Sequence, residues 1–246
     1  MYANEHKGNF PPKKALNCEG HIAPAATIFE ASELYPEYLN ALDVLICPSA
    51  LGGITAVEAW DEGKTLSSNW HVSPQSGDGR VDPCEIYEHP YAYWGWVVEN
   101  RMTSEANIAD LEANIEAFLE DCHDLESTPE AVVRVCENDL VVPDGTGNAE
   151  GNKILRLREG VERFLITDIG YAGATAQSQS DIAIMWDEIA DEPTHYNHIP
   201  GGSNVLFFDG HVEFITYRGP HENRFPVNAG GLLFHEVSHA CEDHDH

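Results

Sequence analysis

Alternating apolar and polar positions surround an Asp-Gly pair in the last quarter of the chain. Two runs rich in β-formers, 203–208 and 211–217, flank Asp209-Gly210. Asp-Gly in this setting indicates a β-hairpin with a two-residue type I′ turn, because both central residues of that turn take positive φ angles. His211 and Glu213 then share one face of the hairpin. The opposite, apolar face is predicted to be buried and to pair Phe207 with Val212 and Val205 with Phe214.

Helical periodicity is clearest between Ser104 and Cys122, where apolar residues recur at spacings of three and four. A second helix is predicted to begin at Thr128, with Thr as N-cap and Pro129 in the first helical position. Residues 25–42 carry an irregular helical pattern. Apolar or aromatic runs predict strands at 43–47 and 91–98, and strands or helix-to-strand segments at 161–169 and 181–186.

These elements indicate one α+β domain that spans residues 1–246. Helical segments come early, an antiparallel sheet comes late, and the β-hairpin lies near the C-terminus. No internal repeat or linker separates independent units, although two loops rich in Gly, Asp and Asn, 73–85 and 144–152, interrupt the pattern.

The chain is strongly acidic, with 13 Lys and Arg against 42 Asp and Glu and a formal net charge of −29. This charge argues against nucleic acid or an anionic lipid surface as a partner, since both are polyanions. A solvated acidic surface is one interpretation, and divalent-cation binding is the other. The carboxylates of Asp78, Asp82 and Glu85 partly follow the spacing of calcium loops, while a polar turn held by Asx hydrogen bonds is the alternative.

A His-Glu-x-x-His sequence lies near the C-terminus, at residues 235–239. On a helix, His235 and His239 share a face and are able to bind one zinc ion, while Glu236 activates its water. Asp245 stands where a metzincin carries its third ligand. Glu242 replaces the usual Gly and no Met-turn follows, so the sequence favours a metal-binding or metal-free tail over a zinc hydrolase.

The six cysteines are Cys18, Cys47, Cys84, Cys122, Cys136 and Cys241. None forms a Cys-x-x-Cys pair, which argues against a zinc ribbon or a thioredoxin-like motif. An even count fits an extracytoplasmic set of disulfides, for which Cys122 and Cys136 are the first candidates because they lie near two adjacent helices. Buried free thiols are the alternative.

Two further groups of residues have more than one interpretation. His195, His198, Asp209 and His211 lie close in sequence and together with Ser203 contain the residue types of a Ser-His-Asp triad, but no Gly-x-Ser-x-Gly elbow is present. His198 before Pro200 is more typical of a loop anchor above the hairpin. The alternating rings of Tyr91, Tyr93, Trp94 and Trp96 suit either a sugar-stacking platform or core packing.

Three stretches together resemble one protein family. Residues 197–214 are similar to the C-terminal signature of planctomycete-type prepilin-like proteins, a His, nine residues and then Asp-Gly; here ten residues separate His198 from Asp209. Residues 154–168 resemble a run in the middle of such proteins. Met1–Pro12 resembles the sequence that follows the long N-terminal helix of a pseudopilin.

The resemblance implies a pilin-like domain of a non-enzymatic, extracytoplasmic subunit in a type II secretion or type IV pilus-like assembly. Its partners would be other protein subunits, and a helix before Met1 would pack on the sheet and anchor the precursor in the inner membrane. The present sequence has no apolar run of 18 residues and no signal peptide at Met1. Calcium is an implied ligand, since some pseudopilins bind it in C-terminal loops. A zinc-dependent hydrolase and a carbohydrate- or surface-binding module are the alternatives.

Overall fold

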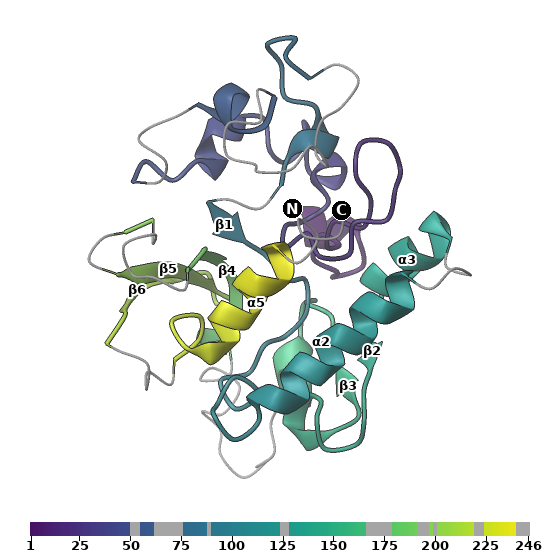
Figure 1. Ribbon diagram of the computed structural model, residues 1–246, viewed down its shortest axis with the longest axis vertical. Helices are drawn as coiled ribbons and strands as arrows, with labels where there is room; N and C mark the ends of the chain where they lie inside the picture. Colours follow the sequence, from purple (N-terminus) through teal and green to yellow (C-terminus); the bar gives the residue numbers. More distant parts are fainter. Residues whose placement is uncertain are drawn as a thin grey trace.

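The computed structural model shows an α+β fold with a four-stranded antiparallel sheet, as predicted (Figure 1). The sheet has the strand order β1-β4-β5-β6, and a separate two-stranded sheet pairs β2 with β3. The strands are β1 (Tyr91–Ala92), β2 (Leu140–Val141), β3 (Lys153–Ile154), β4 (Ala183–Asp187), β5 (Gly202–Phe207) and β6 (Val212–Thr216). The structure describes residues 1–49, 55–61, 76–87, 90–123, 128–165, 179–190, 197–198, 201–218 and 224–239.

The two helices predicted from Ser104 and from Thr128 are present, whereas the irregular helical pattern of residues 25–42 contains only one short turn, η1 (Ala31–Glu33), before Leu42. α2 (Ile108–His123) covers most of the predicted segment, and α3 (Pro129–Cys136) begins after Thr128, whose hydroxyl accepts a hydrogen bond from the Ala131 amide. Two more helices are α1 (Tyr2–Glu5) and α5 (Ala229–His239). Short helical turns complete the described elements: η1 (Ala31–Glu33), η2 (Leu42–Leu45), η3 (Val57–Asp61), η5 (Pro83–Glu85), η6 (Asn148–Glu150) and η7 (Val161–Phe164).

An aromatic cluster joins α5, the sheet and α2. Phe234 of α5 packs against Trp186 of β4 and against Trp94, with ring centroids 5.7 and 4.9 Å apart. Trp94 in turn contacts Phe118 of α2 at 5.8 Å. Figure 1 shows α5 in yellow beside both the sheet and α2. Residues of α5 are in contact with residues of α2. Burial of these rings drives the packing of the helices on the sheet.

The predicted strand at 91–98 is shorter than expected, and the strand at 43–47 is wrong. β1 ends at Ala92, and beyond Gly95, whose φ is +88°, only Trp96 makes a β-bridge, to Arg156. Residues 42–45 form η2 instead of a strand. A four-residue apolar run does not distinguish a strand from a helical turn, and within the described part of the chain no strand pairs with this run to select the extended form. Residues 161–164 form η7, and 166–169 lie outside the described residues.

The predicted hairpin is present, but its predicted register is wrong by one residue. The Phe207 amide donates to the His211 carbonyl at 2.9 Å, so three residues form the loop. Of these, only Gly210 has a positive φ, +89°. This geometry is a type I turn followed by a left-handed Gly, the three-residue alternative to the type I′ hairpin. Val212 and Phe214 are therefore 62% and 46% exposed instead of buried.

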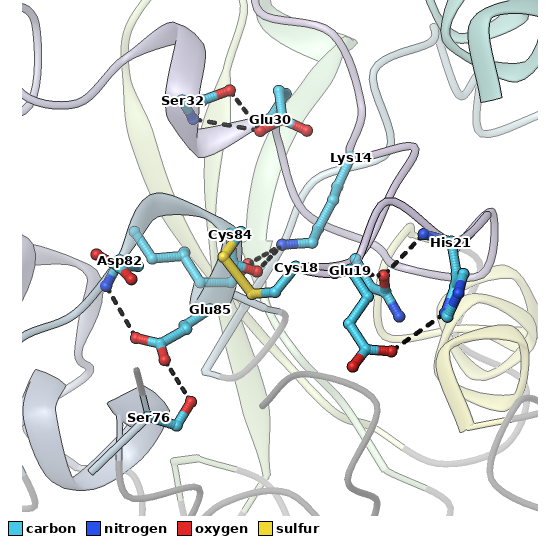
Figure 2. Close-up of a disulfide and its surroundings, with 12 residues drawn as sticks. Lys14, Cys18, Glu19, His21, Glu30, Ser32, Ser76, Asp82, Cys84 and Glu85 are labelled. Carbon is cyan, nitrogen blue, oxygen red and sulfur yellow. Dashed lines mark hydrogen bonds and ion pairs between the residues drawn. A yellow bond between two sulfur atoms is a disulfide. The ribbon is translucent and has the colours of Figure 1, made fainter. Parts of the chain in front are cut away.

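The structure contains a disulfide that the sequence analysis did not single out. Cys18 is bonded to Cys84, 66 residues away in the chain (Figure 2). Lys14 supports the bridge, because its ammonium donates to the carbonyls of Cys84 and Ile86. The predicted pairing of Cys122 with Cys136 is wrong: both thiols are buried and free. The alternative of buried free thiols holds for this pair.

Candidate functional site

Three side chains from distant parts of the sequence meet at one end of the main sheet. Cys47 follows η2, Asp187 ends β4, and His198 lies just before β5. The His198 Nε2 atom is 3.0 Å from the Asp187 Oδ2 atom and 3.5 Å from the Cys47 Sγ atom. One ligand atom from each residue lies within 4.8 Å of the other two. We call these three residues the Cys-Asp-His cluster.

Asp187 is the most deeply buried member of the cluster, with an exposed fraction of zero. Its Oδ2 atom accepts hydrogen bonds from the Asn204 amide at 2.7 Å and from the Asn204 side chain at 2.8 Å. Its Oδ1 atom is buried and has no hydrogen-bond partner among the described residues. Burial raises the pKa of Asp187, although the donors from Asn204 and the nearby His198 partly oppose that rise.

His198 closes the cluster from the solvent side, with 24% of its side chain exposed. Its ring meets Phe214 edge to face, with centroids 5.8 Å apart. The neighbouring Asn197 side chain donates to the Pro90 carbonyl at 2.7 Å, which ties the segment to the start of β1. His198 thus links the segment before β5 to the side chains of Asp187 in β4 and Asn204 in β5. Residues 199 and 200 lie outside the described residues, so its role as a loop anchor stays a prediction.

Tyr91 of β1 borders the same cluster. Burial, followed by the nearby Cys47 and Asp187, raises the pKa of Tyr91 to about 12. The phenol is therefore neutral at physiological pH and able to donate a hydrogen bond to the sulfur of Cys47.

The arrangement differs from that of a catalytic Cys-His-Asp triad. In a triad, the carboxylate holds one ring nitrogen of His while the nucleophile faces the other. Here the same nitrogen of His198 faces both Cys47 and Asp187. The carboxylate therefore does not orient a general base toward the thiol. Thiolate, imidazole and carboxylate converging on one point are instead the donor types of a metal site.

The His-Glu-x-x-His sequence lies on α5, a helix that the sequence analysis did not predict. His235 is half-buried, and its Nδ1 atom is 3.3 Å from the Oε1 atom of buried Glu188. Glu236 is exposed. The side chain of His239 and all of Asp245 lie outside the described residues, so zinc binding by this set stays a prediction.

The loop around Asp78 is organised by another carboxylate, that of Asp61 at the end of η3. The Asp61 side chain accepts hydrogen bonds from the amides of Gly77, Asp78 and Gly79 at 2.7–3.2 Å. Asp78 itself is exposed and caps the amide of Arg80. This is the polar-turn alternative, in which carboxylates satisfy backbone N–H groups.

Glu85 of the same loop points inward. One of its oxygens accepts from the Asp82 amide at 2.8 Å and the other from the Ser76 hydroxyl (Figure 2). Among the described residues, Asp78, Asp82 and Glu85 do not bring three ligand atoms together. The calcium expectation for this loop stays a prediction.

Other residue groups suggested by the sequence have structural roles. Ser203 is buried and donates to the Asp187 carbonyl at 2.9 Å, so it is not an exposed nucleophile. Trp94, Trp96 and Tyr93 are at most 3% exposed, which places their rings in the core and not on a sugar-binding surface. The remaining predicted histidine, His195, lies outside the described residues.

Cys47 and Asp187 were absent from the predicted sites. Cys47 is far from His198 in sequence, and Asp187 is one of many acidic residues. The available signal was an acidic residue at the end of the apolar run 182–186, where a charge is buried only with a partner.

No protein-family model, curated protein or solved structure matches this chain. Among the described residues, no helix has both the length and the apolar character needed to cross a membrane.

Proposed function

We propose that this chain is the pilin-like domain of an extracytoplasmic, non-enzymatic subunit in a type II secretion or type IV pilus-like assembly. The observation that carries the proposal is the β5–β6 hairpin, the segment that resembles the prepilin-like signature. His198 contacts Asp187 of β4 and Asn204 of β5, and Asp209-Gly210 lie in the hairpin loop. These residues hold a sheet together, which is a structural use of the signature.

The outer edge of β6 supports an assembly role. Among the described strands, β6 pairs with β5 alone, so its other edge offers backbone groups for pairing. Val212 and Phe214 are exposed on this strand. An edge strand with exposed apolar side chains is a surface that a neighbouring chain tends to cover. We assign the β6 edge to contact with another copy of this chain within the assembly.

The disulfide supports the extracytoplasmic part of the proposal. Cys18–Cys84 is a bond of the kind that persists in oxidising compartments and is rare in the reducing cytosol. Alkylation of cells after a rapid acid quench measures its redox state directly. We expect Cys18 and Cys84 to be protected as a disulfide. Reduced thiols at both positions in growing cells would contradict an extracytoplasmic location.

Cysteine cross-linking tests the assembly role. Val212→Cys places a thiol on the β6 edge, and Val141→Cys on β2 is a matched control because Val141 is also exposed, at 78%. Both variants keep the same native cysteines, whose contribution therefore cancels. With a short bifunctional maleimide in intact cell envelopes, we expect cross-linked multimers from Val212→Cys and little product from Val141→Cys. Equal yields, or none from Val212→Cys, would refute the assigned surface.

A zinc-dependent hydrolase is the second candidate, and one contact favours it. The carboxylate of Glu188 lies beside the Nδ1 atom of His235, an outer contact often made by zinc-binding histidines. The exposed position of Glu236 counts against a water-excluding site. Peptidase and esterase assays of wild type and Glu236→Gln decide the question. We expect no activity that depends on Glu236; turnover with bound zinc that Glu236→Gln abolishes would make the chain a hydrolase.

A further inference from the structure

We propose that the Cys-Asp-His cluster is a zinc site, with Cys47, Asp187 and His198 as its protein ligands. This site is separate from both metal sites that the sequence suggested, the C-terminal tail and the 78–85 loop. It also goes beyond the proposed assembly role, which assigns no metal.

The spacing of the three ligand atoms fits a tetrahedral zinc ion. Bonds of about 2.3 Å to sulfur and about 2.0 Å to nitrogen or oxygen place sulfur and nitrogen about 3.5 Å apart, and nitrogen and oxygen about 3.3 Å apart. The corresponding distances are 3.5 Å between Cys47 and His198 and 3.0 Å between His198 and Asp187. The third pair, Cys47 and Asp187, lies within 4.8 Å, against about 3.5 Å in a tetrahedral site, so these two side chains would close on the ion by at most roughly 1.3 Å.

Hydrogen bonding alone does not satisfy the cluster. The Nε2 atom of His198 faces an acceptor, the Asp187 carboxylate, and also the donors Cys47 Sγ and Asn204 Nδ2. One ring nitrogen carries either a proton or a lone pair, so it serves one side at a time. A cation bound to thiolate, imidazole and carboxylate replaces these competing demands with three metal–ligand bonds.

The free oxygen of Asp187 is a second, independent observation. This side chain is completely buried within the cluster, and its Oδ1 atom has no hydrogen-bond partner among the described residues. An unsatisfied buried carboxylate oxygen is costly. The oxygen that faces His198, Oδ2, also accepts both donors from Asn204, which fix the carboxylate plane, the usual outer support of a metal-binding carboxylate. Zinc bound through both carboxylate oxygens would also satisfy Oδ1.

The donor types select zinc over calcium. Calcium and magnesium prefer oxygen ligands, whereas thiolate with imidazole suits zinc and its tetrahedral substitutes such as cobalt. Tyr91 and Phe214 border the cluster, and the partial exposure of His198 provides a path for entry. Three protein ligands leave a fourth position for water or another donor.

The test uses the full chain without an affinity tag, because histidines of the C-terminal tail also bind metals. After chelation, the protein is titrated with Zn²⁺ against a competing indicator and, separately, with Co²⁺. Wild type should bind one zinc ion tightly and show a thiolate-to-cobalt charge-transfer band. Cys47→Ser should lose that band and bind zinc at least about 100-fold more weakly, since removing a ligand costs more than removing an outer contact.

Cys122→Ser is the matched control, because Cys122 is a second buried free thiol. It should keep both the cobalt band and the zinc affinity. His198→Gln provides a second ligand variant in case Cys47→Ser does not fold, as checked by circular dichroism, and it should weaken zinc binding similarly. Absence of the band in wild type, its persistence in Cys47→Ser, or unchanged zinc affinity in His198→Gln would overturn the proposal. Stabilisation by Ca²⁺ exceeding that by Zn²⁺ would also overturn it.

Discussion

Replacing both cysteines of the disulfide, Cys18→Ser with Cys84→Ser, should destabilise the protein without changing its fold. The bridge spans a sequence separation of 66 residues. In the chain-entropy description, such a loop removes about 15 cal/mol/K from the unfolded ensemble, which corresponds to about 4 kcal/mol at 25 °C. Typical domains have only about 5–15 kcal/mol of total stability, so this loss is large.

The folded state of this double variant should persist because other contacts hold the same loops. Lys14 is buried, and its ammonium reaches the Ile86 carbonyl at 2.9 Å as well as the Cys84 carbonyl. The Glu85 carboxylate keeps the Asp82 amide and the Ser76 hydroxyl. These hydrogen bonds do not involve sulfur, so the native geometry around the bridge survives its removal.

Urea unfolding followed by tryptophan fluorescence measures the effect, since Trp94, Trp96 and Trp186 are all buried. We expect the free energy of unfolding to fall by about 4 kcal/mol, from the loop entropy alone. Wild type with a reductant should match the double variant, and the reductant should leave the double variant unchanged. A loss below about 1 kcal/mol, or a double variant that still responds to reductant, would refute the loop-entropy argument.

Three further variants test local features by the free energy of unfolding. Gly210→Ala should cost about 1 kcal/mol because Ala disfavours the positive φ of this position, and Gly210→Asn should cost less because Asn tolerates that φ better. No atom lies within 4 Å of a Cβ placed there, so both costs come from the backbone. Equal costs would contradict a purely backbone effect. Thr128→Ala should cost about 1 kcal/mol by removing the cap of α3, while Thr128→Ser should be nearly neutral; an equal loss in both would implicate packing. Burial raises the pKa of Asp139, but hydrogen bonds from Arg158 and the Arg156 amide outweigh it and lower the pKa. The Asp139 carboxylate therefore adds to the free energy of unfolding above its ordinary pKa, and this contribution is lost as the pH falls through the lowered pKa. Asp139→Asn should lower the free energy of unfolding by about 1 kcal/mol at pH 7 and should match wild type in acid. A loss that does not depend on pH would contradict this.

Elements with local signals were predictable from the sequence. α3 follows from Thr128 and Pro129, because an N-cap hydroxyl and a proline in the first turn act on residues next to them. α2 follows from its apolar periodicity, since burial of one face selects the helix. β4 has no capping signal, and the apolar run at 182–186 left a strand and a helix-to-strand segment both open; the structure forms the strand.

The hairpin register was not predictable because Asp-Gly suits two different turns. In the type I′ turn both residues need positive φ, whereas in the three-residue loop only Gly210 does. In the observed loop Asp209 caps the His211 amide at 3.0 Å, and His211 stacks on Phe207 with ring centroids 4.6 Å apart. These contacts form with the three-residue loop, and a one-residue change exposes Phe214.

The Cys-Asp-His cluster was beyond the sequence for a different reason. His198 and Asp187 lie within a dozen residues, but Cys47 is 151 residues from His198. No spacing rule connects ligands that come from a helical turn, a strand end and a loop. Their proximity depends on how β1, β4 and β5 pair, which is a property of the whole sheet.

In a chain with a net charge of −29, the buried carboxylates of Asp187 and Glu162 each keep one oxygen without a hydrogen-bond partner among the described residues. Of these two, only Asp187 lies in a group with a thiol and an imidazole. Asp61 uses both oxygens to bind three loop amides, and Glu85 uses both for the Asp82 amide and a hydroxyl. Each of these carboxylates is satisfied by the chain itself. Asp187 is equally buried but satisfied at one oxygen only. Because a buried charge persists where its cost is offset, the unmet oxygen beside a thiol and an imidazole points to a cation as the missing partner.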